Sequence, residues 1–284
     1  MRKTIKNLLK IYRISPSKRL GQNFLISRSV LKKIVEAAEI SRKDTVLEIG
    51  PGMGNLTFEL AKRAKPARNA SHSDAGGKVI AIEKDKKMVD ILKENLKEVK
   101  NVEIIHGDIL KLDPKFYPLK AYKIVANIPY YLTSRLIRKF LEIRNRPKLM
   151  VLMVQKEVAQ RICAKPPKMN LLAVSVQFYA KPKIISFVSK RSFWPQPKVN
   201  SAIIRIAISS KREETRVKKD LFFKIVKAGF SHPRKQLINN LSEDLRIEKK
   251  TIKKWFLKNG IKPEQRAETL SLDRWIKLLK SYKM

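Results

Sequence analysis

A glycine-rich turn near residue 50 follows a short apolar run and is the first feature with a clear chemical use. The run T-V-L-E-I (45–49) leads directly into G-P-G-M-G-N, with glycines at positions 50, 52 and 54. Glycines allow the backbone to turn sharply and to approach a ligand closely, beside the N-terminus of the following helix. A dinucleotide-binding fingerprint needs glycines at i, i+2 and i+5, but Asn55 occupies i+5 here. The spacing therefore argues against a nicotinamide dinucleotide and for a ligand without a pyrophosphate.

Two acidic residues follow the next two apolar runs along the chain. Glu83 comes after K-V-I-A-I (78–82), and Asp108 comes shortly after V-E-I-I (102–105). The first carboxylate can accept hydrogen bonds from both hydroxyls of a ribose, and the second can accept from an adenine amino group. Because ligands of open α/β sheets bind at the carboxyl ends of the strands, we expect both acids to meet the glycine-rich turn at one crevice. Taken singly, they could be a solvated Glu and a helix-capping Asp, but their order favours the shared site.

The segment A-N-I-P-Y-Y (126–131) places an Asn, a Pro and two tyrosines after the apolar run K-I-V (123–125). A hairpin turn would favour Gly at this point and would not favour two aromatic side chains. Considered alone, Asn127 could cap a turn and the tyrosines could pack in the core. These side chains are also suited to holding a ligand at a fourth strand end.

Alternation of strand and helix patterns organises the first part of the chain. Short apolar runs rich in β-branched residues predict strands, and helical spacing of apolar residues predicts the helices between them. The predicted strands are 45–49, 78–82, 102–105, 123–126 and 149–154, and the predicted helices include 29–39, 55–64, 86–98 and 132–144. This alternation predicts a parallel sheet covered by helices on both faces. A second strand-rich part, 173–189 and 201–208, is expected to extend the sheet.

The pattern changes after about residue 212. Lys-rich amphipathic helices are predicted there, at 218–229, 234–241, 249–258 and 272–282. At the other end, residues 1–20 carry seven Lys or Arg and no acid. The predicted organisation is therefore a basic arm (1–20), an α/β domain (21–211) and a smaller helical domain (212–284). Residues 65–77 are polar and turn-forming, which indicates a surface insertion before the second strand.

The charge balance of the chain is strongly basic. Lys and Arg total 64 against 25 Asp and Glu, which gives a formal net charge of +39 over 284 residues. A surface this basic repels itself and indicates a polyanionic partner, with structured RNA first among the candidates. A Lys-rich composition of the whole source proteome is the alternative explanation. The 43% hydrophobic and 31% charged content is that of a globular protein.

Cysteine, histidine and the apolar runs argue against several other classes. Cys163 is the single cysteine and the three histidines are scattered, so neither a disulfide nor a metal site is expected. No stretch approaches about 18 uninterrupted apolar residues, and the basic N-terminus lacks the apolar core of a signal peptide. We therefore expect a cytoplasmic monomer without a membrane partner. An organellar transit peptide at the acid-free N-terminus is the alternative.

With these features in order, the sequence resembles the class I S-adenosylmethionine-dependent methyltransferases. More narrowly, it is similar to the ribosomal RNA adenine dimethyltransferases that modify two adjacent adenosines near the 3′ end of small-subunit rRNA. The similarity extends from about residue 17 to the end and is carried by L-G-Q-N-F-L (20–25), E-I-G-P-G-M-G-N-L-T (48–57), N-I-P-Y (127–130), Q-K-E-V-A-Q-R (155–161), F-W-P-Q-P-K-V-N-S-A (193–202), R-K-Q-L-I-N-N-L (234–241) and R-A-E-T-L-S (266–271). The insertion at 65–77 and the segment P-P-K-M-N-L-L (166–172) depart from the family pattern without touching its cofactor positions.

The resemblance implies a fold, a cofactor and a set of binding residues. The implied fold is α/β and Rossmann-like, with a seven-stranded, mostly parallel sheet, helices on both faces and a small C-terminal all-α domain that binds rRNA. The implied cofactor is S-adenosylmethionine, with no metal. The residues implied to bind it are Gln22, Asn23 and Leu25 over its methionine end, the backbone of Gly50 and Gly52, Glu83 at the ribose, Asp108 at the adenine amino group, and Lys84, Ile109 and Asn127.

The same resemblance implies how a target adenine is held. The Asn127 side-chain oxygen and the Ile128 carbonyl would accept the two hydrogens of the N6 amine, whose lone pair is otherwise delocalised into the ring. Pro129 would restrain the turn, Tyr130 would stack on the base, and Phe193 would form the second face of the sandwich. The target base must then be unpaired or flipped out of its helix. No charged general base is expected, because the N–H becomes acidic only after methyl transfer.

Other residues near these motifs receive more ordinary interpretations. Tyr131 is expected to pack in the core, and Trp194 to serve packing or a surface contact. Four basic residues are candidates for phosphate contacts, although each alone could be a solvated charge; they are Lys156, Arg161, Arg234 and Lys235.

The implied function is dimethylation of the N6 amines of two adjacent adenosines in the 3′-terminal hairpin of 16S rRNA, with a 30S assembly intermediate as partner. A large-subunit rRNA methyltransferase of the antibiotic-resistance type shares N-x-P-Y and F-x-P-x-P. The segments L-G-Q-N-F-L, R-K-Q-L-I-N-N-L and R-A-E-T-L-S favour the small-subunit group instead. A non-catalytic assembly or transcription factor on the same fold is disfavoured, because Glu83, Asp108 and Asn127 are intact.

Overall fold

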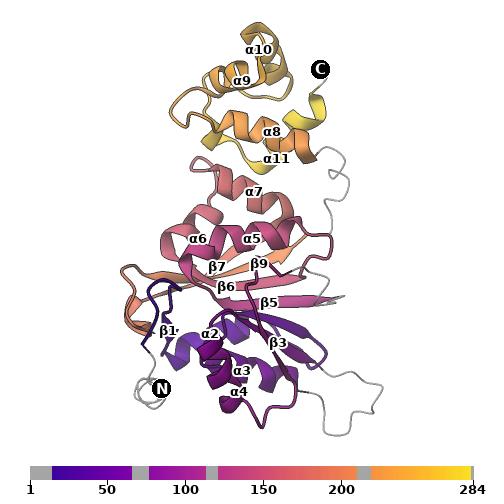
Figure 1. The fold of residues 1–284 in the computed structure, drawn as a ribbon. Coiled ribbons are helices and arrows are strands. Elements are labelled where there is room, and N and C mark those ends of the chain that lie inside the picture. Colours follow the sequence, from indigo (N-terminus) through magenta and orange to yellow (C-terminus); the bar gives the residue numbers. More distant parts are fainter. Residues whose placement is uncertain (1–14, 66–76, 113–120, 210–218, 283–284) are drawn as a thin grey trace. The chain divides into compact units, whose positions relative to one another are not determined.

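Figure 1 shows the fold of the protein in a computed structural model that describes residues 15–65, 77–112, 121–209 and 219–282. Residues 66–76 of the expected insertion and residues 1–14 of the expected basic arm lie outside the described part. The chain packs as two compact units. The α/β unit comprises Met1–Ala159 and Lys183–Ile208, and the helical unit comprises Gln160–Pro182 and Ser209–Met284. No helix among the described residues is long and apolar enough to cross a membrane.

A seven-stranded sheet forms the centre of the α/β unit. Its strands are β2 (Thr45–Ile49), β3 (Lys78–Glu83), β4 (Val102–His106), β5 (Tyr122–Asn127), β6 (Leu149–Gln155), β7 (Ala180–Val188) and β9 (Ser201–Ile208). They lie in the order β4-β3-β2-β5-β6-β9-β7. The first five are joined by parallel pairing, whereas β9 runs antiparallel to β6. The mostly parallel sheet is therefore confirmed, and β2 to β6 fall within about a residue of their predicted bounds.

Helices cover both faces of this sheet, with α3 and α4 on one side and α5 on the other (Figure 1). The helices of the α/β unit are α2 (Arg28–Ala37), α3 (Asn55–Ala64), α4 (Lys86–Asn95) and α5 (Thr133–Glu142), with α6 (Lys156–Ile162) beginning in this unit. Side-chain caps set two of the starts. Ser27 accepts a hydrogen bond from the Val30 N–H at α2, and Asp85 accepts from the Lys87 N–H at α4.

Two short strands that the sequence did not predict lie beside the sheet. Strand β1 (Phe24–Leu25) pairs antiparallel with β8 (Phe193–Trp194), with Phe24 opposite Trp194 and Leu25 opposite Phe193. Strands of two residues are too short to show a periodic pattern. Their pairing joins the segment after residue 20 to the F-W-P-Q-P segment, although these lie far apart in sequence. Short 3₁₀ helices flank them, η2 (Tyr130–Leu132) and η3 (Lys190–Ser192).

The helical unit has its own core. It contains α7 (Leu171–Tyr179), α8 (Lys219–Gly229), α9 (Leu237–Leu245), α10 (Lys249–Lys258), η5 (Ala267–Thr269) and α11 (Leu272–Ser281). Phe178 of α7 stacks on Phe222 of α8 with ring centroids 4.3 Å apart, and Trp275 of α11 is fully buried. Large apolar side chains thus join the helices of this unit. The expected small all-α part of the fold is confirmed.

Helix α7 corrects one prediction. Residues 171–179 are helical, whereas the sequence predicted strand from residue 173. The segment L-L-A-V-S-V-Q-F-Y is apolar on nearly every side, so helix and strand periodicity cannot be distinguished in it. The helix packs with α8 and α11, so residues 160–182 group with the C-terminal helices rather than with the rest of 21–211. As functional domains, the three predicted ranges remain a prediction.

Candidate active site

One cavity at the carboxyl ends of β2, β3 and β5 is lined by every residue that the sequence nominated for cofactor binding or catalysis. These are Gln22, Asn23, Leu25, Gly50, Gly52, Glu83, Lys84, Asp108, Ile109, Asn127, Ile128, Pro129, Tyr130 and Phe193. All of them belong to the α/β unit. Their roles in binding and catalysis stay predictions. The cavity is also lined by residues that the sequence did not nominate, of which Glu48 and Tyr131 matter most.

The glycine-rich turn runs from β2 into α3 in a conformation that needs glycine. Gly50, Gly52 and Gly54 have φ angles of +67°, +57° and +86°. Side chains rarely adopt such angles without strain. A Cβ at Gly52 would also lie 3.2 Å from the Phe24 ring, and one at Gly54 would lie 2.7 Å from Leu92. The backbone is therefore held as an open cradle beside the N-terminus of α3.

Glu83, at the end of β3, is held by backbone groups on both sides of the cavity. Its Oε2 accepts from the Gly52 N–H at 3.1 Å, and its Oε1 accepts from the Asp85 N–H at 2.9 Å. Burial raises the pKa of Glu83, although these backbone hydrogen bonds oppose the shift. Each carboxylate oxygen has a second lone pair, so two hydroxyl donors can still be accepted.

Asp108, just past the end of β4, forms an ion pair across the strand ends. Its Oδ2 lies 2.9 Å from Lys84 Nζ, and its Oδ1 accepts from the Leu110 N–H at 3.0 Å. Burial acts to raise the pKa of Asp108, but the hydrogen bonds from Lys84 and Leu110 outweigh it and hold the pKa below its ordinary value. Asp108 is therefore a carboxylate at neutral pH and can accept from an amino group.

Lys139 of α5 anchors the turn that follows Asp108. Its ammonium donates to the backbone carbonyls of Ile109 at 2.8 Å, Leu110 at 3.3 Å and Leu112 at 2.6 Å. An ammonium group has three donors, so these three carbonyls match its capacity. The helix that follows N-I-P-Y therefore also holds one wall of the cavity. This role of Lys139 could not be predicted from the sequence, because the sequence does not distinguish it from other lysines on amphipathic helices.

Glu48 is the functional candidate that the sequence analysis missed. Its side chain lies in β2, is 1% exposed and lines the cavity. Burial raises the pKa of Glu48 to about 8; the Thr57 hydroxyl opposes the shift, and the negative charge of Glu83 adds to it. Its Oε2 has no hydrogen-bond partner within the described part of the chain. A buried carboxyl without a partner is costly, so the position suits a ligand that donates or carries positive charge. The signal available was the acid within the apolar run T-V-L-E-I.

The segment around residues 20–25 is tied down over the cavity by side-chain amides. Gln22 accepts from the Ser17 N–H at 2.8 Å and donates to Asp85 Oδ2 at 2.8 Å. Both ends of its amide are thus engaged by the protein. The Asn23 amide donates to the Gly21 carbonyl at 3.1 Å, which tightens the same turn. Gln22 and Asn23 therefore line the cavity while their side chains stabilise the segment itself.

Asn127, at the end of β5, is oriented by this segment. Its Nδ2 donates to the Asn23 carbonyl at 3.1 Å, across 104 residues of sequence. With Nδ2 engaged, the acceptor oxygen Oδ1 is the part of the amide that remains for a ligand. The neighbouring segments pack closely, since a Cβ at Gly21 would lie 3.2 Å from the Pro129 side chain. The structure thus brings N-I-P-Y, the glycine-rich turn and residues 20–25 together at one cavity.

The aromatic residues differ from one another in burial. The Tyr130 hydroxyl lies 2.7 Å from Ser201 Oγ, and burial raises its pKa above the ordinary value. Phe193 lines the cavity, but its side chain is only 2% exposed and packs with Leu25. Tyr131 was expected in the core, and that expectation is wrong, because its side chain is 54% exposed at the cavity. Neighbours in a 3₁₀ turn face different directions, so adjacent tyrosines need not share an environment.

These features fit the cofactor that the sequence implied. S-adenosylmethionine carries a positively charged sulfonium and amino group, a ribose and an adenine. The buried, unpartnered Oε2 of Glu48 suits the cationic end, Glu83 has lone pairs for the ribose hydroxyls, and Asp108 is an ionised acceptor for an amino group. The described residues contain no group of three or more His, Cys, Asp or Glu side chains arranged to bind a metal ion.

Comparison with known proteins agrees with this geometry. Residues 15–284 match a family model described as ribosomal RNA adenine dimethylase. A protein of Dehalococcoides mccartyi (strain CBDB1) named ribosomal RNA small subunit methyltransferase A is 45% identical over 279 residues, which is 98% of this chain and 92% of that relative. Such a match extends well beyond the motifs quoted above and covers both units.

Two solved structures share the fold. The 23S rRNA methyltransferase ErmE has a TM-score of 0.74 and 25% sequence identity, and the match covers 91% of this chain and 99% of ErmE. A dimethyladenosine transferase from Plasmodium falciparum has a TM-score of 0.72 and 28% identity, covering 90% of this chain and 95% of that one. Since the family model spans nearly the whole chain and the relatives match along their whole length, this protein belongs to the ribosomal RNA adenine dimethylase family.

Proposed function

We propose that this protein, an S-adenosylmethionine-dependent rRNA adenine dimethyltransferase by its family, methylates two adjacent adenosines in the 3′-terminal hairpin of small-subunit rRNA. The observation that carries the chemistry is the meeting of N-I-P-Y and the glycine-rich turn at one cavity. The substrate assignment draws on relatives named ribosomal RNA small subunit methyltransferase A, at 45% identity in Dehalococcoides mccartyi. The modification belongs to small-subunit assembly.

Asn127 and Ile128 orient the amine that receives the methyl group. The Asn127 Oδ1 accepts one N6 hydrogen and the Ile128 carbonyl accepts the other, which favours a pyramidal nitrogen and sets the angle of attack. The hydrogen bond from Asn127 Nδ2 to the Asn23 carbonyl supports this role, because it determines which end of the amide meets the base. Holding the amine in this orientation lowers the activation barrier for methyl transfer, because the reacting atoms are already positioned. The released proton passes to water.

Aromatic side chains hold the face of the target base. Tyr130 is the proposed stacking surface, and its hydrogen bond to Ser201 keeps the ring in place. Stacking on one aromatic ring contributes about 1–3 kcal/mol. Phe193 is the proposed second face. Because its ring packs with Leu25 of β1, this role requires β1 to move away from β8 when the base enters.

The other half of the cavity binds the cofactor, which supplies an electrophilic methyl group on a sulfonium when bound. Glu83 accepts from the ribose hydroxyls and Asp108 from the adenine amino group, with Lys84 and Ile109 beside them. Gly50 and Gly52 contribute backbone, and Gln22, Asn23 and Leu25 cover the methionine end. Glu48 joins this set, since its unpartnered buried oxygen suits the cationic end.

The strongly basic chain supports an RNA partner, and a 30S assembly intermediate is the proposed substrate form. The C-terminal helices contribute to rRNA binding in this proposal. A monomer acting in the cytoplasm, without a membrane partner, is the simplest arrangement. Binding to rRNA is expected to weaken steeply with salt, since several phosphates must be neutralised.

The decisive experiment is methylation of unmodified 30S particles with labelled cofactor, followed by mapping of the product nucleoside. We expect N6,N6-dimethyladenosine at two adjacent positions near the 3′ end of 16S rRNA. Unmodified 50S particles form the parallel reaction, because the solved structure of ErmE, a 23S rRNA methyltransferase, is also similar to this chain. Label in 23S rRNA and none in the 30S particle would overturn the substrate assignment.

A further inference from the structure

The α/β unit exposes a patch in which an aromatic ring is covered by a lysine. Phe187 of β7 is 54% exposed, and Lys156 Nζ lies 5.2 Å from its ring centroid. Ile185, two residues earlier and therefore on the same face of the strand, is 37% exposed. Two exposed apolar side chains on one strand face offer a small surface on which a partner can pack. Strand β7 is the edge strand of the sheet, so within the described residues no strand pairs with its outer edge.

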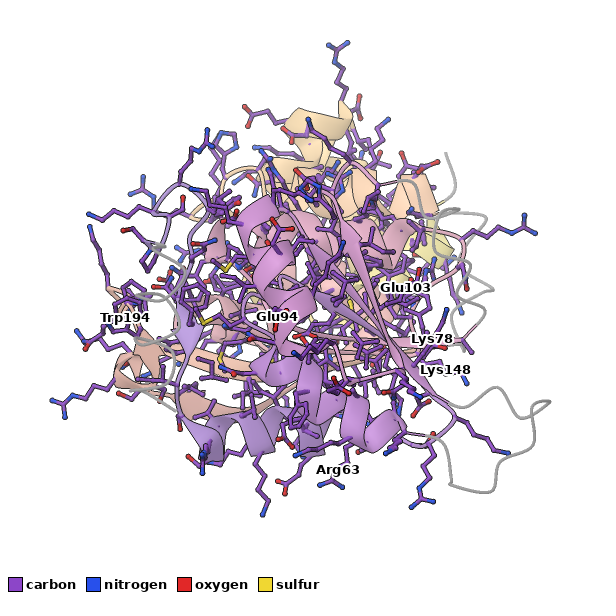
Figure 2. The ribbon with its side chains drawn as sticks, turned by 60° about the horizontal axis from the view of Figure 1, so that its bottom comes forward. Arg63, Lys78, Glu94, Glu103, Lys148 and Trp194 are labelled. Atoms are coloured by element: carbon purple, nitrogen blue, oxygen red, sulfur yellow. The ribbon has the colours of Figure 1, made fainter. Side chains whose placement is uncertain are left out.

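A chain of contacts connects this patch to the proposed base pocket. The Tyr130 hydroxyl is hydrogen-bonded to Ser201 Oγ. Asn200, the residue before Ser201, accepts hydrogen bonds from two neighbouring segments. The Asn200 carbonyl accepts from the Lys156 N–H at 3.0 Å, and its Oδ1 accepts from the Lys190 N–H at 3.0 Å. The backbone of Lys156 in the patch is therefore linked through Asn200 and Ser201 to Tyr130 at the pocket. Figure 2 labels Trp194, on the segment after β7, at the edge of the molecule.

Most charged residues around the patch are basic, although Glu36 and Glu39 line a hollow together with Ile185. From Val158 to Arg212 the sequence contains no acidic residue. Within the described residues of the α/β unit, none of the cations near the patch forms an ion pair except Arg205, which pairs with Glu39 at 2.9 Å. The others are Lys156, Lys183, Lys190, Arg191 and Lys198. Aromatic and apolar side chains among unpaired lysines complement a nucleic acid, whose bases stack and whose phosphates need cations.

A second aromatic–lysine pair in the same unit provides a contrast. Phe58 of α3 is 41% exposed, and Lys62 Nζ lies 4.3 Å from its ring centroid. Lys62 also pairs with Glu59 at 3.3 Å. Phe58 lines a second cavity, which shares Leu31, Met53 and Asn55 with the candidate active site but is lined by neither Tyr130 nor Asn200. In Figure 2, Arg63, the next residue after Lys62, and Trp194 lie at different edges of the molecule.

We propose that Phe187, with Lys156 and Ile185, forms a docking surface for the rRNA next to the target adenosine. A flanking base stacks on Phe187, and its phosphates contact Lys156 and Lys190. This inference rests on the proposed function. The docking surface sets how the RNA backbone enters, while N-I-P-Y holds the base that reacts. It is a binding surface and takes no part in methyl transfer.

The test compares Phe187→Ala with the matched variant Phe58→Ala on unmodified 30S particles. Loss of one base–aromatic stack predicts a rise of about tenfold in the KM for particles in Phe187→Ala, with unchanged kcat and cofactor affinity. Phe58→Ala should leave all three at the wild-type values, and Phe187→Trp should restore the KM. Lys156→Gln should lower the slope of log affinity against log salt by about 1. Thermal unfolding of each variant checks that the fold is intact.

The outcomes separate the two proposals. A wild-type enzyme that does not label 30S particles defeats the proposed function. An active wild type with an unchanged KM in Phe187→Ala, or with equal rises in both Phe variants, overturns the docking surface alone. Binding of protein-free small-subunit rRNA decides the occupant. An equal defect there supports RNA, whereas a defect confined to intact particles would assign the surface to a ribosomal protein and overturn the proposal.

Discussion

The proposed cofactor-binding half of the cavity and the proposed base-binding half are built in different ways. In the cofactor half, groups at neighbouring strand ends hold one another, as when Glu83 accepts from the backbone of Gly52 and Asp85. In the base half, side chains join segments that are distant in sequence, as when Asn127 donates to the Asn23 carbonyl and Tyr130 meets Ser201. The contacts of the cofactor half follow from the topology of the sheet. The contacts of the base half form only when segments distant in sequence meet in the folded chain.

This difference indicates which half of the cavity is preformed and which half can change conformation when a substrate binds. Backbone donors at strand ends persist as long as the sheet does, so the cofactor half is expected to be preformed. The base half relies on side chains whose partners lie on distant segments, as with Asn127 and Tyr130. Such contacts belong to the less stable part of a protein, which is where substrate-responsive movement is found.

The largest expected effect is on the base half. We predict that Asn127→Ala lowers the single-turnover rate of methylation by about 10²-fold or more, because an oriented polar group at the reacting atom is lost. Cofactor affinity, measured by calorimetry, should change little. Asn101→Ala, which removes an amide bonded to the Ala61 carbonyl outside the cavity, provides the control. Turnover near that of the wild type in Asn127→Ala would remove Asn127 from the mechanism.

The next prediction concerns Glu48, the exception in the cofactor half, since it lacks a partner for Oε2. In the folded state burial raises its pKa to about 8, well above the ordinary range of a glutamate. Between the ordinary pKa and this raised pKa the native state binds a proton that the unfolded state has released, so stability falls as pH rises from about 5 to 8. Glu48→Gln stays neutral and should avoid this loss.

We therefore expect Glu48→Gln to resemble the wild type in urea unfolding near pH 5.5 and to exceed it by about 2 kcal/mol at pH 8, without cofactor. The exposed variant Glu103→Gln, on β4, should show no such trend; Figure 2 labels Glu103 beside its ion-pair partner Lys78. A difference in unfolding free energy between Glu48→Gln and the wild type that is constant across pH would contradict the raised pKa of Glu48.

A smaller effect is expected from Glu83. Glu83→Ala removes acceptors for two hydroxyl donors and should weaken cofactor binding by about tenfold or more. At saturating cofactor, the single-turnover rate should remain close to that of the wild type, because Glu83 does not contact the target base. Equilibrium binding and single-turnover kinetics of the same variant separate these quantities. A large loss of rate at saturation would show that the halves are not independent.

The smallest effect is expected from Tyr130→Phe. The substitution keeps the stacking ring and leaves Ser201 Oγ without its partner, which costs about 1 kcal/mol of stability. Methylation should fall only slightly. Tyr131→Phe, whose side chain is exposed, should change neither quantity. If Tyr130→Phe abolished activity while the fold persisted, the hydroxyl rather than the ring would be the important group.

Much of the cofactor half could be predicted from the sequence. Continuous apolar runs defined β2 to β6, and the rule that ligands bind at strand ends placed Glu83 and Asp108 together. Glu48 escaped prediction because an acid inside a strand shows nothing of its partners until burial is known. Helix α7 was missed because its apolar residues have no preferred side.

For the base half, the sequence predicted the motif but not the contacts that its side chains make in the folded chain. The pattern N-I-P-Y identified Asn127, yet nothing near it in sequence indicated that Asn23 would orient its amide. The exposure of Tyr131 had no sequence signal, because two adjacent tyrosines at the start of a helix carry no period. Pairing of β1 with β8 likewise joins residues that only the folded chain brings together.

The two halves of the cavity are not fully separate, because Lys139 connects them. Its helix, α5, begins directly after the segment that holds the base, while its ammonium secures the carbonyls that follow Asp108. A ligand that steadies one end of this connection reduces the conformational entropy that the second ligand must remove. If cofactor and rRNA are coupled through this contact, each changes the other's affinity by the same factor, because the coupling free energy belongs to the pair. Lys139 is therefore a contact through which binding of one ligand is expected to strengthen binding of the other.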